Sequence, residues 1–209
     1  DVDLSALSYY EVTEGVVSDV PVVLARTGYT GEDGFELYVH RERACGLWES
    51  IESAGADLGL RPVGLAARDT LRLEMKYALY GNDIDETTRP LEAGLGWVVK
   101  LDKEDFIGRD ALARLKEEGI GRRLVAFEVE GRGVPRAGYE LCIDGERMGT
   151  VCSGTFSPTL RKGIGTAYVR KGHTRSGTRL TMDVRGRSVP VCVVKPPFYS
   201  GGSLRRSAG

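Results

Sequence analysis

The sequence predicts an α+β fold followed by a small all-β barrel or jelly roll, and three observations support this. Strand-like and helix-like segments alternate up to residue 75, a pattern typical of an α+β sandwich. After residue 121, short strand-like segments follow at regular spacing, with no helix-like segment between them. The 28 glycines exceed an average usage of about 7% and favour a turn-rich, β-containing protein over a helical bundle.

Two strands joined by a glycine-rich turn are predicted near the N-terminus. Residues 22–25 form the first, and residues 35–39 form the second, in which Glu36 and Tyr38 share the face opposite the apolar residues. A carboxylate on that face, beside a glycine-rich turn, suits a polar and flat ligand. The alternative is a plain β-hairpin with a polar tip, because residues 32–34 (Glu-Asp-Gly) are ordinary turn residues.

Two helices should follow these strands. Residues 41–54 place apolar side chains at helical spacing, and Gly55 is predicted to end that helix. Pro62 fits the first turn of a second helix that continues to Met75. Within this helix, Arg68 could hold a carboxylate or stack on a flat ring; an ion pair with a neighbouring carboxylate is the alternative.

The middle of the chain is predicted to be less regular. Residues 80–90 are rich in Asn, Asp, Thr and Pro and should form a loop. Residues 105–116 should form a short helix, and residues 118–121 a linker between domains. An Asp144-Gly145 hairpin turn is expected in the region that follows. The strands expected there are 124–129, 140–143, 148–155, 164–169, 180–184 and 189–194.

Composition limits the classes of function. The formal net charge of −1 gives no reason to expect nucleic acid or a membrane surface as a partner. No apolar run approaches the roughly 20 residues that span a bilayer. The four cysteines lack a Cys-x-x-Cys pair and there are only two histidines, so no metal site is expected. We therefore expect buried or half-buried free thiols in a reducing compartment.

Six segments, in one collinear order, resemble the T-protein of the glycine cleavage system, an aminomethyltransferase family. Several long motifs in one order are far more specific than a single glycine-rich loop. The segments are 26–36 (RTGYTGEDGFE), 64–74 (GLAARDTLRLE), 79–86 (LYGNDIDE), 90–100 (PLEAGLGWVVK), 106–112 (FIGRDAL) and 149–160 (GTVCSGTFSPTL).

This resemblance implies an activity and a site. The family transfers a methylene unit from the aminomethyl-lipoyl group of the H-protein to tetrahydrofolate, which yields 5,10-methylenetetrahydrofolate and releases ammonia. Its folate-binding positions fall here on Tyr29, Glu36 and Arg68, and near the C-terminus on Arg205, with Arg206 as the rival. Their chemistry is suitable: a carboxylate accepts the paired N–H donors of a pterin edge, and a tyrosine or guanidinium stacks on the ring.

The family's catalytic aspartate lies in an N-terminal part that this chain is expected to lack, so the catalytic residue is unknown here. Asp33, Asp69 and Asp83 are expected to be structural. The chain begins with Asp1 and without a visible signal peptide, which suggests truncation upstream. The missing part is thus an expected partner, and the fragment alone should be inactive. No nucleic acid or membrane partner is expected.

The resemblance also implies a domain plan. Residues 1–67 should belong to a ferredoxin-like, folate-binding α+β domain, and residues 68–118 to a second, interrupted α+β domain. Residues 119–200 should form the β-barrel domain, and residues 201–209 a basic tail.

Other assignments within and beyond folate chemistry stay open at this point. They are the folate domain of a sarcosine or dimethylglycine dehydrogenase, a sulfur-compound demethylase, and a non-catalytic folate-binding relative. The bacterial cytoplasm and the mitochondrial matrix are both compatible locations.

Overall fold

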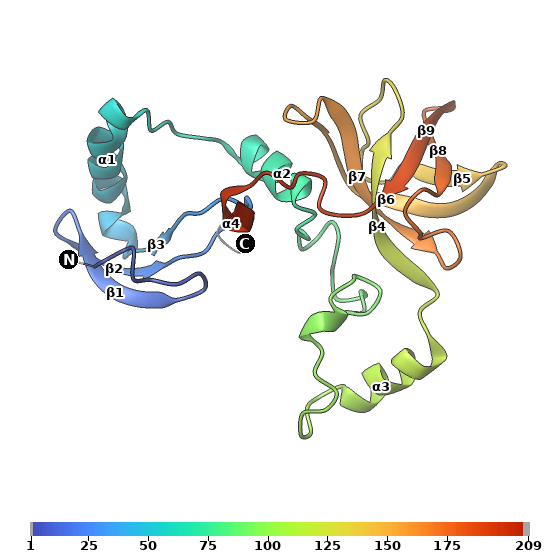
Figure 1. Ribbon diagram of the computed structural model, residues 1–209, viewed down its shortest axis with the longest axis horizontal. Coiled ribbons are helices and arrows are strands. Elements are labelled where there is room, and N and C mark those ends of the chain that lie inside the picture. Colours follow the sequence, from blue (N-terminus) through green and yellow to red (C-terminus); the bar gives the residue numbers. More distant parts are fainter. Residues whose placement is uncertain (1, 207–209) are drawn as a thin grey trace. The chain divides into compact units, whose positions relative to one another are not determined.

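The computed structural model describes residues 2–206, except for the side chains of Arg205 and Arg206, and it divides into two compact units (Figure 1). The first unit comprises the residues up to Leu71 together with those from Gly201 on. The second comprises Arg72–Ser200. The division into folate-binding, interrupted and barrel domains stays a prediction.

A three-stranded antiparallel sheet forms the centre of the first unit. Its strands are β1 (Val12–Val17), β2 (Val20–Ala25) and β3 (Glu36–Tyr38), in the order β1-β2-β3. Ser18 and Asp19 both have positive φ, at 49° and 61°, as a tight two-residue hairpin between β1 and β2 requires. Strands β2 and β3, which flank the glycine-rich segment, correspond to the two strands predicted at residues 22–25 and 35–39.

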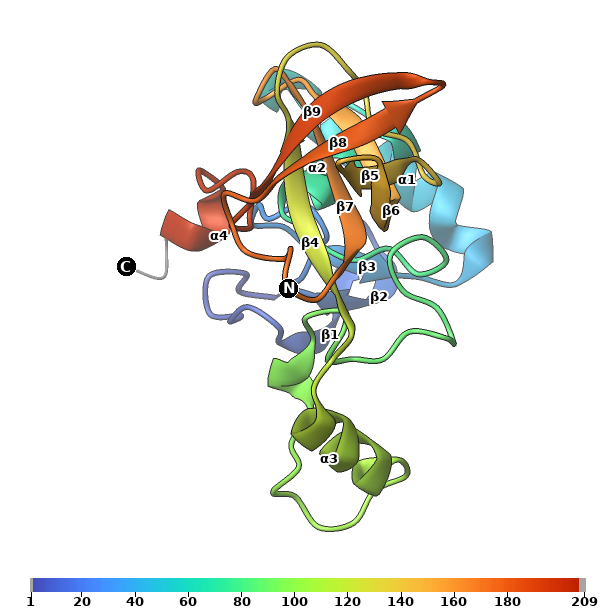
Figure 2. The ribbon, with the colours of Figure 1, turned by 90° about the vertical axis from the view of Figure 1, so that its right-hand side faces the viewer.

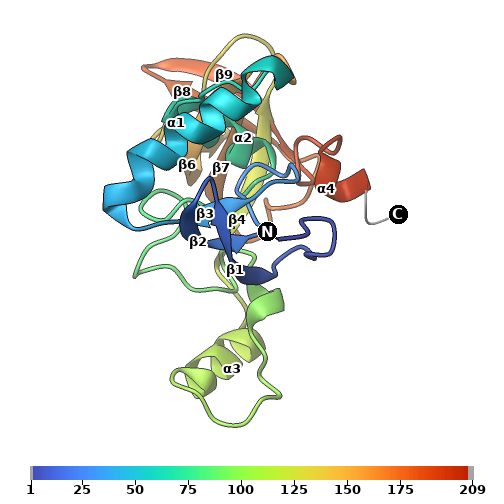
Figure 3. The ribbon, with the colours of Figure 1, turned by 90° about the vertical axis from the view of Figure 1, so that its left-hand side faces the viewer.

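Helix α1 (Ala44–Gly55) covers one face of this sheet, as Figure 3 shows. A 3-10 turn, η1 (Arg41–Arg43), leads into it. The apolar stripe of α1 packs on the inward-facing residues of the sheet, because alternate residues of a strand point to the same side. The buried residues of this core are Leu7, Val20, Val22, Leu24 and Leu47.

Helix α1 ends at Gly55, as predicted. The chain then enters a 3-10 turn, η2 (Ala56–Leu58), and takes the left-handed conformation only at Gly59, with φ of 79°. Gly55 also serves packing: a Cβ atom there would lie 2.5 Å from the Leu60 side chain. Glycine at this position therefore lets Leu60 pack close to the helix end.

Helix α2 (Leu65–Glu74) starts later than predicted. Pro62 precedes it, and the Gly64 carbonyl accepts the first turn's hydrogen bonds from the amides of Ala67 and Arg68. The helix crosses the division between the units: residues up to Leu71 belong to the first, and its last three, which are buried, belong to the second.

A closed antiparallel barrel dominates the second unit, with the strand order β4-β7-β6-β5-β8-β9 (Figure 2). This confirms the predicted fold class, and closure decides between barrel and jelly roll. The positive φ of Asp144 (50°) and Gly145 (81°) confirms the predicted hairpin turn. The strands are β4 (Arg122–Val129), β5 (Glu140–Ile143), β6 (Glu146–Ser157), β7 (Lys162–Arg170), β8 (Arg179–Val184) and β9 (Arg187–Val194).

Between α2 and the barrel the chain forms loops, a 3-10 turn η3 (Gly96–Val98) and helix α3 (Arg109–Glu118). The predicted helix start at residue 105 was wrong, because Gly108 has a φ of 89° and breaks any earlier turn. The last element that the structure describes is a short helix, α4 (Ser203–Arg206), which belongs to the first unit.

The cysteines divide into two groups. Cys142, Cys152 and Cys192 lie half-buried in β5, β6 and β9, as predicted. Cys45 is exposed, contrary to the prediction, because α1 buries only the stripe around Leu47. Among the residues that the structure describes, no helix is both long and apolar enough to cross a membrane.

Candidate functional site

The glycine-rich loop (residues 26–35) joins β2 to β3 and is closed at its base by an ion pair. Arg26 donates from Nε and Nη2 to the two carboxylate oxygens of Asp33, at 2.9 and 2.8 Å. Its Nη1 donates to the Leu7 carbonyl at 2.7 Å. The Arg26 hydrogen bond lowers the pKa of Asp33 below its ordinary value. The loop is therefore a constrained platform, and Asp33 has the structural role that the sequence suggested.

Tyr29, at the tip of this loop, contacts Arg68 on the first turns of α2. The Arg68 guanidinium carbon lies 4.4 Å from the centroid of the Tyr29 ring, within the range of a cation–π contact. Tyr29 is half-buried and Arg68 is exposed, so the stacked pair is accessible from solvent. The structure thus brings together two of the four residues that the sequence predicted to bind folate.

Glu36 is the first residue of β3 and its side chain is exposed. The Tyr38 hydroxyl donates a hydrogen bond to the Glu36 carboxylate at 3.2 Å, and this bond raises the pKa of Tyr38. The two residues share one face of the strand, as the alternation predicts. In this structure the Glu36 carboxylate therefore accepts a hydrogen bond from Tyr38, whereas Arg68 stacks on Tyr29.

Arg205, the fourth predicted residue, belongs to helix α4. The structure describes its backbone but not its side chain. Two residues earlier, Ser203 hydrogen-bonds to Glu32 and to the backbone amide of Asp33. Sequence reasoning missed both Glu32 and Ser203. The only signal was the place of Glu32 within the glycine-rich motif, because no local pattern connects residues 171 positions apart.

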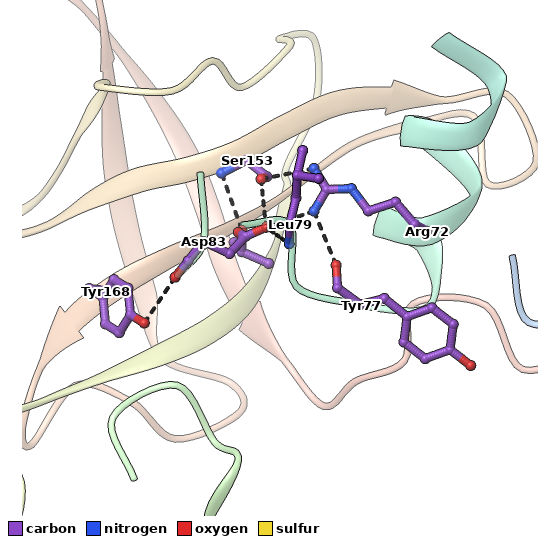
Figure 4. A network of polar contacts seen from close by, with 7 residues as sticks. Arg72, Tyr77, Leu79, Asp83, Ser153 and Tyr168 are labelled. Atoms are coloured by element: carbon purple, nitrogen blue, oxygen red, sulfur yellow. Dashed lines mark hydrogen bonds and ion pairs between the residues drawn. The ribbon is translucent and has the colours of Figure 1, made fainter. Parts of the chain in front are cut away.

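A buried polar network fixes Asp83 in the second unit (Figure 4). Arg72 donates to the Asp83 carboxylate at 2.7 Å and to the Ser153 hydroxyl at 3.0 Å. Ser153 donates to Asp83 at 2.9 Å, Thr166 also donates to it, and the Tyr168 hydroxyl donates to the Asp83 carbonyl at 2.9 Å. These contacts use the Asp83 carboxylate within the fold and give it a structural role.

The second unit also contains a polar cavity of about 490 Å³. Arg122 lies at its wall, with its guanidinium carbon 4.6 Å from the centroid of the Tyr168 ring. Burial raises the pKa of Tyr168 to about 12 and that of the Cys152 thiol to about 11, so both stay protonated at neutral pH. Of the predicted folate-binding residues whose side chains the structure describes, Tyr29, Glu36 and Arg68, none lines this cavity.

Within residues 2–206, no group of three or more His, Cys, Asp or Glu side chains is arranged to hold a metal ion.

Two family models match this chain. Residues 1–103 match the GCVT N-terminal domain, and residues 122–200 match the glycine cleavage T-protein C-terminal barrel domain. The second match coincides with the closed barrel of β4 to β9.

Similar proteins cover almost the whole chain. An aminomethyltransferase of Halothermothrix orenii is 53% identical over 197 residues, which is 94% of this chain and 55% of that protein. One from Symbiobacterium thermophilum is 54% identical over 199 residues, 94% of this chain and 53% of that protein. The chain therefore spans about half the length of the curated relatives it matches.

A solved structure agrees with these matches. The crystal structure of the glycine cleavage system aminomethyltransferase T from Bartonella henselae superposes with a TM-score of 0.88 at 32% sequence identity, covering 97% of this chain and 55% of that chain. The predicted resemblance is confirmed. This chain belongs to the glycine cleavage T-protein family.

Proposed function

We propose that this chain forms the folate-binding portion of a tetrahydrofolate-dependent aminomethyltransferase of the glycine cleavage system. The complete enzyme would move a methylene unit from the aminomethyl-lipoyl group of the H-protein to tetrahydrofolate and release ammonia. The lipoylated H-protein is its proposed partner. The catalytic aspartate is proposed to lie in the half of the relatives that this chain does not span.

The observation that carries this proposal is the stacked pair of Tyr29 and Arg68, 4.4 Å apart and open to solvent. Two groups that stack on aromatic rings occur together here: Tyr29 on the loop that is closed by the Arg26–Asp33 ion pair, and Arg68 on α2. Glu36 adds an exposed carboxylate on the adjoining strand, suited to the paired N–H donors of a pterin edge. These residue types fit a flat, polar heterocycle.

The folate would supply the nucleophilic nitrogen that accepts the one-carbon unit. The residues of this chain would bind and orient it. Glu36 would hold the pterin edge, and Tyr29 would pack on the ring or hydrogen-bond to it. Arg68 and Arg205 would provide cations for ring stacking or for the glutamyl carboxylates.

Calorimetric titration with tetrahydrofolate tests this proposal in the complete protein. Glu36→Ala and Arg68→Ala should each weaken binding by about 1–3 kcal/mol, because each leaves a polar partner unpaired in the complex. Matched controls are Glu49→Ala on α1 and Arg43→Ala before it, both exposed and in the same unit. Unchanged dissociation constants for both Glu36→Ala and Arg68→Ala would contradict the proposal.

A second assay distinguishes an active enzyme from a protein that binds folate without catalysis. Ammonia release from aminomethyl-loaded H-protein should depend on tetrahydrofolate in the complete protein, and this chain alone should not turn over. Folate binding without folate-dependent ammonia release would favour the non-catalytic relative. The bacterial cytoplasm and the mitochondrial matrix both stay predictions for the location.

A further inference from the structure

We propose that Glu32 and Ser203 are positioning residues that hold the C-terminal segment, which carries Arg205, against the glycine-rich loop that carries Tyr29. This inference rests on the proposed function, because it explains how two folate-binding positions distant in the sequence are brought to one place. Figure 1 shows α4 beside the loop between β2 and β3, within the first unit.

Among the described residues, Glu32, Asp33 and Ser203 join the two segments through three hydrogen bonds. The backbone amide of Ser203 donates to the Glu32 carboxylate at 2.8 Å, and its hydroxyl donates to the same oxygen at 2.6 Å. The Ser203 hydroxyl in turn accepts a hydrogen bond from the backbone amide of Asp33 at 2.7 Å. Ser203 therefore uses its amide, its hydroxyl hydrogen and its hydroxyl oxygen toward two consecutive loop residues. Bonds to an ionised carboxylate are the stronger kind.

The backbones also approach closely at this point. Gly202 is buried, and a Cβ atom on it would lie 2.5 Å from the Gly31 carbonyl oxygen. Gly31 itself has a φ of 78°, a conformation that side chains other than glycine rarely adopt. This close approach therefore requires glycine at both positions. Like the hydrogen bonds, it places the C-terminal segment against the glycine-rich loop.

The loop side of this contact is itself constrained. Asp33, whose amide donates to Ser203, is held through its side chain by Arg26. Tyr29 lies three residues before Glu32 in the same loop, and Arg205 lies two residues after Ser203 in α4. The Glu32–Ser203 contact thus limits where Arg205 can be relative to Tyr29.

Ordering this segment before a ligand arrives would lower the entropic cost of binding. The hydrogen bonds are exposed, so their contribution to the stability of the fold should be small. A role in positioning is therefore distinguishable from a structural role: the affinity for folate should change while the unfolding transition does not.

The first test does not involve folate. Hydrogen–deuterium exchange of the peptide that includes Leu204 and Arg205 is compared among wild type, Glu32→Gln and Ser203→Ala in the complete protein. Both variants should exchange faster in this peptide, whereas Ser203→Thr, which keeps the hydroxyl, should exchange like wild type. Glu49→Gln on α1 is the matched control for removing an exposed charge. Unchanged exchange in Glu32→Gln and Ser203→Ala would overturn the inference.

The second test measures the dissociation constant for tetrahydrofolate. Glu32→Gln should raise it about tenfold, as expected for the loss of a charge-assisted hydrogen bond, without shifting the thermal unfolding midpoint. In an Arg205→Ala background, Glu32→Gln should raise it less than about twofold, because the residue through which Glu32 acts is gone. Equal effects of Glu32→Gln in both backgrounds would overturn the positioning role.

Arg68→Ala distinguishes a failure of this inference from a failure of the proposed function. If Arg68→Ala weakens folate binding and Glu32→Gln does not, the positioning role is wrong while the folate site stands. If neither variant nor Glu36→Ala changes folate binding, the proposed function is wrong, and the positioning role fails with it even where exchange at α4 is faster.

Discussion

At the scale of single residues, the buried Arg72–Asp83 pair shows how a charge can be removed from water without a large penalty. Both side chains are almost fully buried, and each makes further hydrogen bonds beyond the ion pair. A buried ion pair is a weak source of net stability when intact, because desolvation offsets the attraction. Its disruption is costly, since one charge is then left buried without its partner.

Asp83→Ala should destabilise the second unit by about 3–5 kcal/mol, because it removes the carboxylate that forms the ion pair with the buried Arg72 guanidinium. Denaturant unfolding followed by circular dichroism measures this. Asp102→Ala, which removes an exposed carboxylate from a loop of the same unit, is the control. The double variant Arg72→Met with Asp83→Leu should lose less than Asp83→Ala alone. A loss no larger than that of Asp102→Ala would contradict this role.

The thiols provide a prediction that depends on pH. Burial raises the pKa of Cys152 to about 11, so its reactive thiolate is a minor species below that pH, about one part in a thousand at pH 8. Iodoacetamide at pH 8 should therefore modify the exposed Cys45 first and Cys152 much later, as peptide mass spectrometry can show. Raising the pH toward 10 should accelerate modification of Cys152. Equal rates for both thiols at pH 8 would contradict the burial argument.

Residue-scale features divide clearly into those that the sequence revealed and those that it did not. The motif predicted Tyr29 and Arg68, and the structure places the guanidinium over the ring. It did not predict that Ser203 would bind Glu32, because the partners of a side chain depend on how the whole chain folds. Glu36 was placed on the correct face of its strand by alternation alone.

At the scale of elements, the barrel strands depend on glycines where neighbouring strands approach. A Cβ atom on Gly149 in β6 would lie 2.3 Å from the Tyr168 carbonyl oxygen in β7. Backbone atoms cannot move aside as a flexible side chain can, so the position excludes larger residues. Alternation of apolar residues predicted the cores of β4 to β9 but not this requirement.

Gly149→Ala should therefore destabilise the barrel by about 1–3 kcal/mol or more, because the added methyl group forces β6 and β7 apart. Thermal unfolding measures the loss. Gly121→Ala, just before β4, is the matched control, since a Cβ atom there would meet nothing within 4 Å. Similar melting temperatures for the two variants would argue against the strand spacing described.

Helix starts were less predictable than the helix end at Gly55, which was predicted correctly. The sequence placed helix starts at Pro62 and residue 105, whereas the structure has them at Leu65 and Arg109. Both errors have the same origin. Several residues near each helix could start it, and local preference alone does not select among them.

At the scale of the whole molecule, the two sheets differ in how their edges are treated. The barrel is closed, so each of its strands is paired on both sides, whereas within the described part of the chain β1 and β3 each pair only with β2. Unpaired edges leave backbone amides open to solvent and to local unfolding. The barrel core is also built from twelve buried apolar residues drawn from all six strands.

Hydrogen exchange followed by mass spectrometry should reflect this difference. Peptides from β4, β6 and β7 should exchange at least about tenfold more slowly than peptides from β1 and β3. The comparison is internal, since both sets come from one sample at one pH. Faster exchange in the barrel than in the three-stranded sheet would contradict the assigned closure.

The sequence by itself determined the fold class, the strands of the barrel, the Asp144-Gly145 turn and the family. These depend on alternation, turn residues and motif order, which act over short stretches of chain. Only the tertiary structure decided that Arg68 stacks on Tyr29, that Cys45 is exposed, and that Asp83 is enclosed by Arg72 and Ser153. Tertiary contacts of this kind join Arg72 to Ser153, 81 positions apart, and Glu32 to Ser203, 171 positions apart. They exist only once the chain has closed its sheets, because local preferences set the path of the backbone and not the meeting of distant side chains.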